Sequence, residues 1–335
     1  MKRSKYNLVL VVWHDDPRVW SDLRRIAARV QQIDPDVRSF VVAHHKLDQL
    51  KLLPLWFQRT LSLLIPLVPK RKLLPGRFLT GTRLHKVGEY ARLDAAGIPV
   101  PKWTIVAPDT QLDPTVWGPY VVEKPSAGRV GANIRVRRAS RVRYTPPESF
   151  PAGHYGRQGP MLAQRFIYTG HWPTSYRVIT LFGDTLLCYR QKTISRGRPL
   201  TGRWNFRETG GINVISNTKD MIVELVKDED VIALAERAHR AAFQDFPVLA
   251  FDIIRDAETG ELFVLECHAH GTWLFSSEAV RGIQAANNID FESQFDLIEK
   301  SARILARETR SRAAISWPLR YRSQAPARVD FKVGD

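Results

Sequence analysis

The chain has 335 residues, of which 44% are hydrophobic and 25% charged, and its formal net charge at pH 7 is +16. This length allows two or three packed cores, and the hydrophobic fraction excludes a wholly disordered chain. Two cysteines, Cys188 and Cys267, exclude a disulfide framework and a cysteine-rich zinc site, and they favour a reducing, cytoplasmic location. No stretch has the length and apolar character of a transmembrane helix.

The positive charge favours a polyanionic partner, such as nucleotide phosphates, nucleic acid or an anionic membrane surface. A solvated basic surface is the competing interpretation, because net charge reports on association and not on fold.

The first 80 residues predict a small α/β unit. A strand over Tyr6–Trp13, a helix over Val19–Val30 and a strand over Val37–Ala43 give a β-α-β order and a parallel sheet. The apolar segment Leu50–Val68 follows, and its prolines exclude one straight helix. We predict a broken helix there, packed on the first unit or at a homodimer contact. A helix on a membrane surface is the alternative.

The middle of the chain is organised around a glycine-containing turn. A strand over Tyr120–Glu123 leads to Lys124 and then to the sequence SAGRVG at Ser126–Gly131. Glycines let backbone N–H groups approach phosphate oxygens, and the lysine adds a point charge. A short glycine turn is also common in ordinary hairpins. The other elements predicted here are a helix over His85–Ala96 and a strand over Met161–Ile167.

The C-terminal half begins with a predicted hairpin that carries Arg177 and Arg190, one on each strand. Two arginines in an apolar hairpin suggest a phosphate or carboxylate partner. The polar, glycine-rich segment Thr193–Gly211 is predicted to be a mobile loop that closes over a site. The remaining predictions are helices over Asp228–Phe246 and Phe295–Arg307 and an extended or disordered basic tail from Ser311.

A second predicted hairpin contains two acids at positions that should be apolar. Its strands, Val248–Ile254 and Leu262–Leu265, flank a turn, so their pairing brings Asp252 and Glu266 close together. Two carboxylates at short range raise each other's pKa unless a cation lies between them. Oxygen ligands suit Mg²⁺ or Mn²⁺. Two half-exposed acids on a surface hairpin are the alternative.

Together, these motifs resemble the ATP-grasp superfamily of carboxylate–amine ligases over roughly residues 80–300. The segments that carry the likeness are Lys86, AGIPVP at Ala96–Pro101, Lys124-Pro125, SAGRVG, QRFI at Gln164–Ile167 and ECH at Glu266–His268. The resemblance implies an α/β fold in which two α+β lobes grip ATP, preceded by a small βαβ parallel-sheet domain. The implied divisions are an N-terminal domain (1–80), a central lobe with the glycine loop (81–170), a C-terminal lobe with the metal site (171–310) and a basic tail (311–335).

The resemblance also implies which residues bind the nucleotide. Lys86 and Lys124 would hold the α- and β-phosphates, the Ser126–Gly131 backbone would cover the β- and γ-phosphates, and the QRFI segment would grip the adenine edge. Two departures affect the base and the sugar: Gln164 replaces the usual Glu, and His171 stands near the usual ribose-binding acid. The implied nucleotide-binding residues are Lys86, Lys124, Ser126, Gly128, Arg129, Gly131, Gln164, Arg165, Phe166, Ile167 and His171.

Asp252, Glu266 and His268 stand where relatives hold Mg²⁺. His268 replaces an Asn of the family, and an imidazole ligand would favour Mn²⁺. Arg177 and Arg190 would stabilise the transferred phosphoryl group or clamp the acid. His270 is a candidate general base, with a structural histidine as the alternative.

The implied activity is ATP-dependent amide formation through an acyl phosphate, on an amino acid, a peptide or a related small acid. One alternative is a non-catalytic nucleotide-binding relative that acts as a scaffold or regulator. Another is a basic nucleic-acid-binding protein, which is disfavoured because only Trp317–Arg322 combines aromatic and basic residues.

Overall fold

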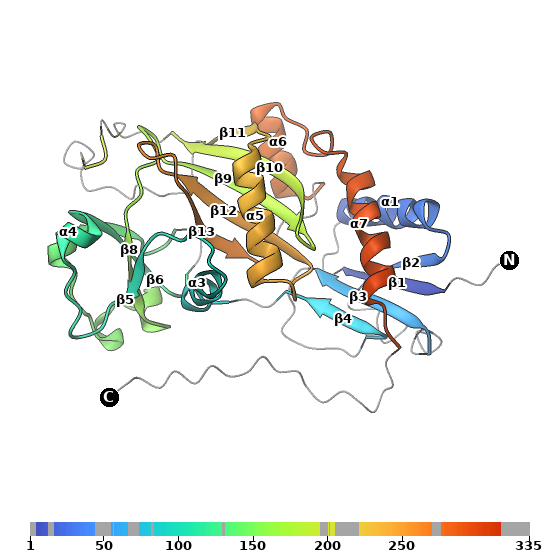
Figure 1. The fold of residues 1–335 in the computed structure, drawn as a ribbon, viewed down its shortest axis with the longest axis horizontal. Helices are drawn as coiled ribbons and strands as arrows, with labels where there is room; N and C mark the ends of the chain where they lie inside the picture. The colour runs from blue at the N-terminus through green and yellow to red at the C-terminus, as the bar shows by residue number, and fades with distance from the viewer. Residues whose placement is uncertain are drawn as a thin grey trace.

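The computed structural model describes residues 5–12, 17–43, 55, 57–65, 74–81, 84–128, 131–194, 200, 202–204, 221–269 and 276–315. The strands in these ranges form three sheets, one parallel and two antiparallel (Figure 1). The predicted architecture, a small parallel-sheet unit followed by two α+β lobes, is confirmed.

The first sheet is parallel and has the order β2-β1-β3-β4. The first helix, α1 (Pro17–Ile33), connects β1 to β2 and presents Leu23, Ile26 and Val30 to the sheet. The last helix in the described residues, α7 (Leu297–Arg312), packs beside α1 and adds Ala302 and Leu305 to the same core. The strands are β1 (Tyr6–Val12), β2 (Val37–Ala43), β3 (Arg59–Ile65) and β4 (Arg77–Thr80).

The prediction of a broken helix over Leu50–Val68 is wrong for residues 59–65. Residues 59–65 form β3, an inner strand with β1 on one side and β4 on the other. Leu61 and Leu63 pack on one face of the sheet and Leu64 on the other, and all three are buried, so they cannot face a membrane. An inner strand of a parallel sheet is apolar on both faces, and periodicity does not distinguish it from a buried helix.

The second sheet, of the central lobe, is antiparallel with the order β5-β8-β6-β7. Its strands are β5 (Trp103–Ile105), β6 (Tyr120–Pro125), β7 (Arg135–Arg138) and β8 (Met161–Arg165). The lobe also contains α4 (Pro114–Trp117) and the 3₁₀ turns η2 (Ala139–Arg141), η3 (Pro147–Ser149) and η4 (Tyr155–Arg157). The helix α3 (Lys86–Ala95) lies between this sheet and the third one (Figure 1) and contacts α5 and β13 of the C-terminal lobe.

The third sheet, of the C-terminal lobe, is antiparallel with the order β11-β10-β9-β12-β13. Helix α5 (Glu229–Ala242) crosses one face (Figure 1), where Leu234 and Ala238 pack with Val178 and Phe251. The strands are β9 (Thr174–Leu181), β10 (Asp184–Thr193), β11 (Met221–Leu225), β12 (Val248–Arg255) and β13 (Leu262–His268), and α6 (Glu278–Asn287) contacts β11.

The opposite face of the third sheet is divided between core and cleft. Ile179, Leu181 and Ala250 join the core that contains α1 and α7, whereas Asp252 and Gln191 line a cleft. The first sheet reaches the same region, because Gly81, just after β4, would clash with the carbonyl oxygen of Ala269 at 2.4 Å if it had a Cβ atom. The carboxyl edge of the parallel sheet therefore lies beside the end of β13.

None of the helices in the described ranges is long and apolar enough to cross a membrane.

Candidate active site

The cleft lies between the second and third sheets. The central lobe contributes residues of β6, β8 and the segment after β8, and the C-terminal lobe contributes residues of β9, β10, β12 and β13. Among the residues predicted to bind nucleotide or metal, nine line it: Lys86, Lys124, Gly131, Gln164, Arg165, Phe166, Ile167, Asp252 and Glu266. His171 does not line the cleft, but its neighbour Gly170 does.

Strand register places a row of polar and charged side chains across the third sheet. Tyr189 of β10 pairs with Arg177 of β9, Arg177 pairs with Asp252 of β12, and Asp252 pairs with Glu266 of β13. Directly opposed residues share a face of the sheet, so all side chains of this row project from the same face. The predicted proximity of Asp252 and Glu266 is confirmed by this pairing.

A β-bulge next to the acids breaks the regular ladder. Asp252 pairs with Glu266 but Ile253 pairs with Val264, which leaves Leu265 as the extra residue of β13. A bulge bends its strand and frees backbone groups from the ladder. The carbonyl oxygen of Leu265 accepts a hydrogen bond of 2.7 Å from the Tyr90 hydroxyl of α3. The bulge thus anchors α3 to the row of acids.

Asp252, Glu266 and His268 form a cluster that could hold a divalent cation. One ligand atom from each lies within 4.8 Å of the others. Nε2 of His268 is 3.4 Å from Oδ2 of Asp252, and Nδ1 is 4.0 Å from Oε1 of Glu266. Carboxylate oxygens and an imidazole nitrogen suit Mg²⁺ or Mn²⁺, with the nitrogen favouring the latter. The donor set therefore fits such an ion.

Protein cations already neutralise both acids. Nε and Nη2 of Arg177 each donate to Asp252 at 2.7 Å, and Nζ of Lys86 donates to Glu266 at 2.7 Å. Burial alone would raise the pKa of Asp252, but Arg177 and His268 hold that pKa well below its usual range. Burial also opposes the lowering of the Glu266 pKa by His268 and Lys86. Any metal ion bound here must share these acids with Arg177 and Lys86.

Lys124 faces this cluster from the other lobe. It is 3% exposed, and its ammonium group donates to the Tyr90 hydroxyl at 2.6 Å and to Oε1 of Gln164 at 2.7 Å. Burial, followed by repulsion from Lys86, lowers the pKa of Lys124 to about 7. A buried ammonium group without a carboxylate bonded to it is suited to an anion brought by a ligand.

Glu89, in the first turn of α3, is a buried acid that the sequence patterns do not single out. It is 5% exposed, and its Oε2 has no hydrogen-bond partner among the described residues. Burial, and then the charge of Glu266, raise the pKa of Glu89 to about 7. A glutamate in an amphipathic helix gives no local sign of burial, so only the packing of α3 on β13 could reveal it.

We expect Glu89→Gln to stabilise the protein at pH 8 by about 1–3 kcal/mol and to have little effect at pH 4.5. Between pH 4.5 and about 7 the folded state keeps a proton that the unfolded state loses, so wild-type stability falls as the pH rises through that window. Urea unfolding at pH 5 and pH 8 measures the difference. Glu229→Gln, at an exposed first-turn position of α5, is the control, and a destabilised Glu89→Gln at pH 8 would contradict the expectation.

The far end of the cleft is apolar. Val122, Phe166, Tyr168 and Leu200 form one buried cluster, and Ile134 packs against it. Four of these five residues, all except Tyr168, also line the cleft. Gln164 lies between this apolar wall and Lys124. A ligand with a flat apolar group joined to phosphates would fit this cleft, with the flat group against the apolar wall and the phosphates beside the lysines.

The other predicted site residues have different positions. Ser126 is buried and its carbonyl oxygen accepts from the backbone N–H of Lys86 at 3.1 Å, which ties the glycine turn to α3. Gly128 begins that turn, and Gly131 has a positive φ of 68° and lines the cleft. His171 is exposed, and its Nδ1 donates to the carbonyl oxygen of Leu200 at 2.7 Å. Arg129 and His270 lie outside the described residues.

Arg190 is not brought to the cluster. It pairs with Tyr176 across β9 and β10 and forms an ion pair with Glu224 of β11. Because Tyr189 is the residue opposite Arg177, Arg190 projects from the other face of the sheet. The two arginines therefore do not act together at this site.

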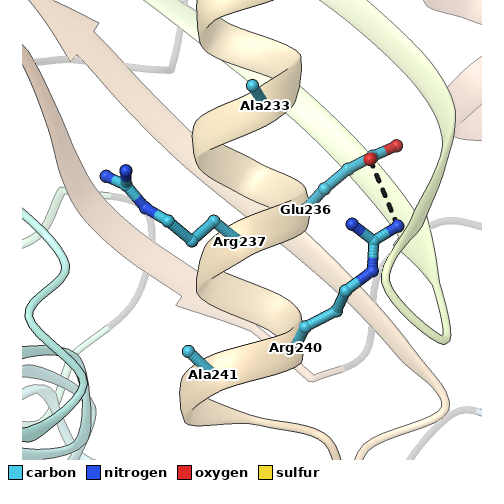
Figure 2. Close-up of a pocket in the computed structure, with 5 residues that line it drawn as sticks. All are labelled: Ala233, Glu236, Arg237, Arg240 and Ala241. Carbon is cyan, nitrogen blue, oxygen red and sulfur yellow. Dashed lines mark hydrogen bonds and ion pairs between the residues drawn. The ribbon is translucent and has the colours of Figure 1, made fainter.

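A separate shallow depression on the outer surface is lined by α5 alone. Figure 2 shows its residues Ala233, Glu236, Arg237, Arg240 and Ala241, with an ion pair of 3.2 Å between Glu236 and Arg240. One helix face without converging groups from another element does not form a binding site.

No family model and no curated protein matches the chain by sequence. Solved structures resemble it over most of its length. ATP-grasp ligases are among the resembling structures. They include the ATP-grasp ligase PsnB in complex with a phosphomimetic variant of its minimal precursor, Mg and ADP, with 16% identity, a TM-score of 0.49 and coverage of 92% of this chain and 99% of PsnB.

Two further examples are enzymes that their names describe as a ligase and a synthetase. D-alanine–D-alanine ligase from Bacillus anthracis, in complex with ATP, has 12% identity, a TM-score of 0.45 and coverage of 90% of this chain and 99% of its own. The D-cycloserine synthetase DcsG has 15% identity, a TM-score of 0.46 and coverage of 84% and 99%.

Proposed function

We propose that this protein is an ATP-dependent carboxylate–amine ligase. The observation that carries the proposal is the charge arrangement of the cleft, with a carboxylate–histidine cluster on the third sheet facing two buried lysines. Of the two lysines, Lys86 directly contacts the cluster, because its ammonium group donates to Glu266 from helix α3. This arrangement suits the binding of a triphosphate with its divalent cation.

The proposed reaction has two steps. A carboxylate oxygen of the acid attacks the γ-phosphorus of ATP, the bond from that phosphorus to the bridging oxygen breaks, and ADP leaves with the electron pair. The amine nitrogen then attacks the acyl carbon, phosphate leaves, and the amine proton is released. The net product is an amide with ADP and phosphate.

The residues of the cleft position the reactants and neutralise charge. Lys86 and Lys124 bind phosphate oxygens, and Arg177 orients Asp252 through two hydrogen bonds. Asp252, Glu266 and His268 would hold the divalent cation, which when bound supplies positive charge at the transferred phosphoryl group. The acid and amine substrates would enter beside Ala269, where the carboxyl edge of the first sheet meets the cluster. No covalent nucleophile of the protein is needed.

The proposal is tested by ADP release from MgATP and MnATP with pooled amino acids, dipeptides and other small carboxylates, with mass spectrometry of the mixture. We expect ADP together with a product that is lighter by one water than the sum of its two parents. ATP binding without ADP formation with any pool would instead favour a non-catalytic nucleotide-binding protein. The neutralisation of both acids by Arg177 and Lys86 is the observation that favours this second candidate.

We expect His268→Asn to shift metal preference toward Mg²⁺. An imidazole nitrogen favours Mn²⁺ over Mg²⁺, so its replacement by an amide oxygen should lower the ratio of Mn²⁺- to Mg²⁺-supported kcat/KM by about tenfold. The ratio is measured from ADP release at saturating concentrations of each metal. His154→Asn, at a helix-capping histidine of the central lobe, is the control. An unchanged ratio of Mn²⁺- to Mg²⁺-supported kcat/KM would show that His268 is not a metal ligand.

A further inference from the structure

Four described residues lie at or near the apolar end of the cleft. They are Leu200, Gly202, Arg203 and Trp204, which we call the strap. Leu200 completes the apolar wall and lines the cleft, and it is 4% exposed. Its N–H donates to the carbonyl oxygen of His171 at 2.8 Å, and its carbonyl oxygen accepts from the ring of the same histidine.

Arg203 attaches the strap to the C-terminal lobe. Its Nη2 donates to both oxygens of Asp256 at 2.7 and 2.9 Å, and its Nε donates to Glu258 at 2.7 Å. The side chain of Arg203 is 12% exposed and that of Asp256 is 4% exposed. The Arg203–Asp256 pair is largely removed from water, whereas Glu258 is half exposed, and the two-pronged contact with Asp256 is a strong and directional attachment.

Trp204 attaches the strap to the central lobe. Its ring stacks on Tyr120 with a centroid distance of 6.3 Å and lies 6.2 Å from the ring of Phe166. A Cβ atom at Gly118 would lie 2.8 Å from the Trp204 ring, so this close contact requires glycine there. The strap thus touches both lobes, with the cleft-lining Leu200 close to the two attachments.

We propose that Arg203 is a positioning residue for nucleotide binding, and that it acts by holding Leu200 against the base end of the cleft. This inference rests on the proposed function. Arg203 does not line the cleft, so its effect on a nucleotide must pass through the strap. Loss of the Arg203 contacts should leave the phosphate-binding lysines and the metal cluster in place, but Leu200 should no longer be held in the apolar wall.

The test compares Arg203→Gln and Arg203→Lys with Arg190→Gln, which breaks an exposed ion pair on the same lobe. Hydrogen exchange of the segment containing residues 200–204 is measured on the nucleotide-free protein, and the Kd for ATP is measured by calorimetry with Mg²⁺. For Arg203→Gln we expect about tenfold faster exchange in this segment and about tenfold weaker ATP binding, with kcat little changed. Arg203→Lys, which keeps the charge, should lie between it and wild type. Arg190→Gln should match wild type.

Three results would overturn the proposal. One is an unchanged Kd in Arg203→Gln, and another is a raised Kd without faster exchange in the strap. The third is an equal effect of Arg190→Gln. If wild-type protein itself binds no ATP, the proposed function fails and this inference fails with it. Normal ATP binding in both wild type and Arg203→Gln sinks the inference alone.

Discussion

Lys124→Met should abolish ADP formation, with a loss of at least roughly 10³-fold in kcat/KM, and leave the fold intact. Lys124 is a buried cation of the central lobe that has no carboxylate bonded to it among the described residues, and its ammonium group donates to Tyr90 and Gln164. Methionine has a similar length and no charge, so it fills the same buried space without binding phosphate. ADP release with the substrates found above measures the loss.

The same variant has a predicted stability profile. The folded-state pKa of Lys124, about 7, lies below the ordinary value of 10.5. Below pH 7 both states hold the proton, and the folded state bears the whole cost of burying the charge. Between pH 7 and 10.5 only the unfolded state keeps the proton, so wild-type stability rises with pH. This rise should be missing in Lys124→Met, which denaturant unfolding at pH 7 and pH 9 would show.

Lys102→Met is the matched control for Lys124→Met. Lys102 is an exposed lysine of the same lobe whose ammonium group lies over the ring of Trp117. Its replacement should preserve activity. Full activity of Lys124→Met would refute the assignment of the cleft as a triphosphate site.

Asp252→Asn should remove both metal binding and turnover. It deletes one of the two carboxylates of the cluster, and we expect ADP formation to fall by roughly 10³-fold and Mn²⁺ binding, measured by electron paramagnetic resonance with ADP present, to weaken at least tenfold. It also leaves Arg177 without its paired carboxylate in a largely buried place, at a cost of about 2–4 kcal/mol in unfolding free energy.

A double variant separates the chemical effect of Asp252→Asn from its effect on stability. Asp252→Asn combined with Arg177→Met removes both charges and should recover most of the lost stability without recovering Mn²⁺ binding. Glu224→Gln, at an exposed carboxylate on β11, is the control for charge loss on the same sheet. Normal Mn²⁺ binding by the double variant would exclude Asp252 as a ligand.

The parts of the fold that could be predicted from sequence are those with local signals. The β12–β13 hairpin follows from two apolar runs around a turn, and its register brings Asp252 opposite Glu266 as predicted. The helix over His85–Ala96 appears as α3 at Lys86–Ala95, and the β-α-β opening appears in full. Hairpin rules also predict that β9 and β10 pair, but not the register of that pair.

The orientation of Arg190 could not be predicted, because a single β-bulge in β10 changes which face of the sheet it projects from. Asp184 pairs with Leu181, but after a bulge between Thr185 and Leu187 the register has shifted by one, so Tyr189 and not Cys188 lies opposite Arg177. Without that bulge, strand alternation would place Arg190 on the same face as Arg177. No local pattern in the sequence marks the bulge. The burial of Glu89 and the attachment of Arg203 to Asp256 depend likewise on segments far apart in the chain.

The position of α7 has a consequence for the order in which the molecule folds. Ion pairs join α7 and the residues before it to the first unit: Arg25 with Glu292, Arg29 with Glu299, and Arg310 with Asp34. Thr60 of β3 also forms a bridge with Ala314. The first sheet therefore completes its core only with residues that are made more than 200 positions later. Before α7 is made, α1 alone covers this leucine-rich face, and a truncation into α7 would leave the part of the face that α7 covers exposed.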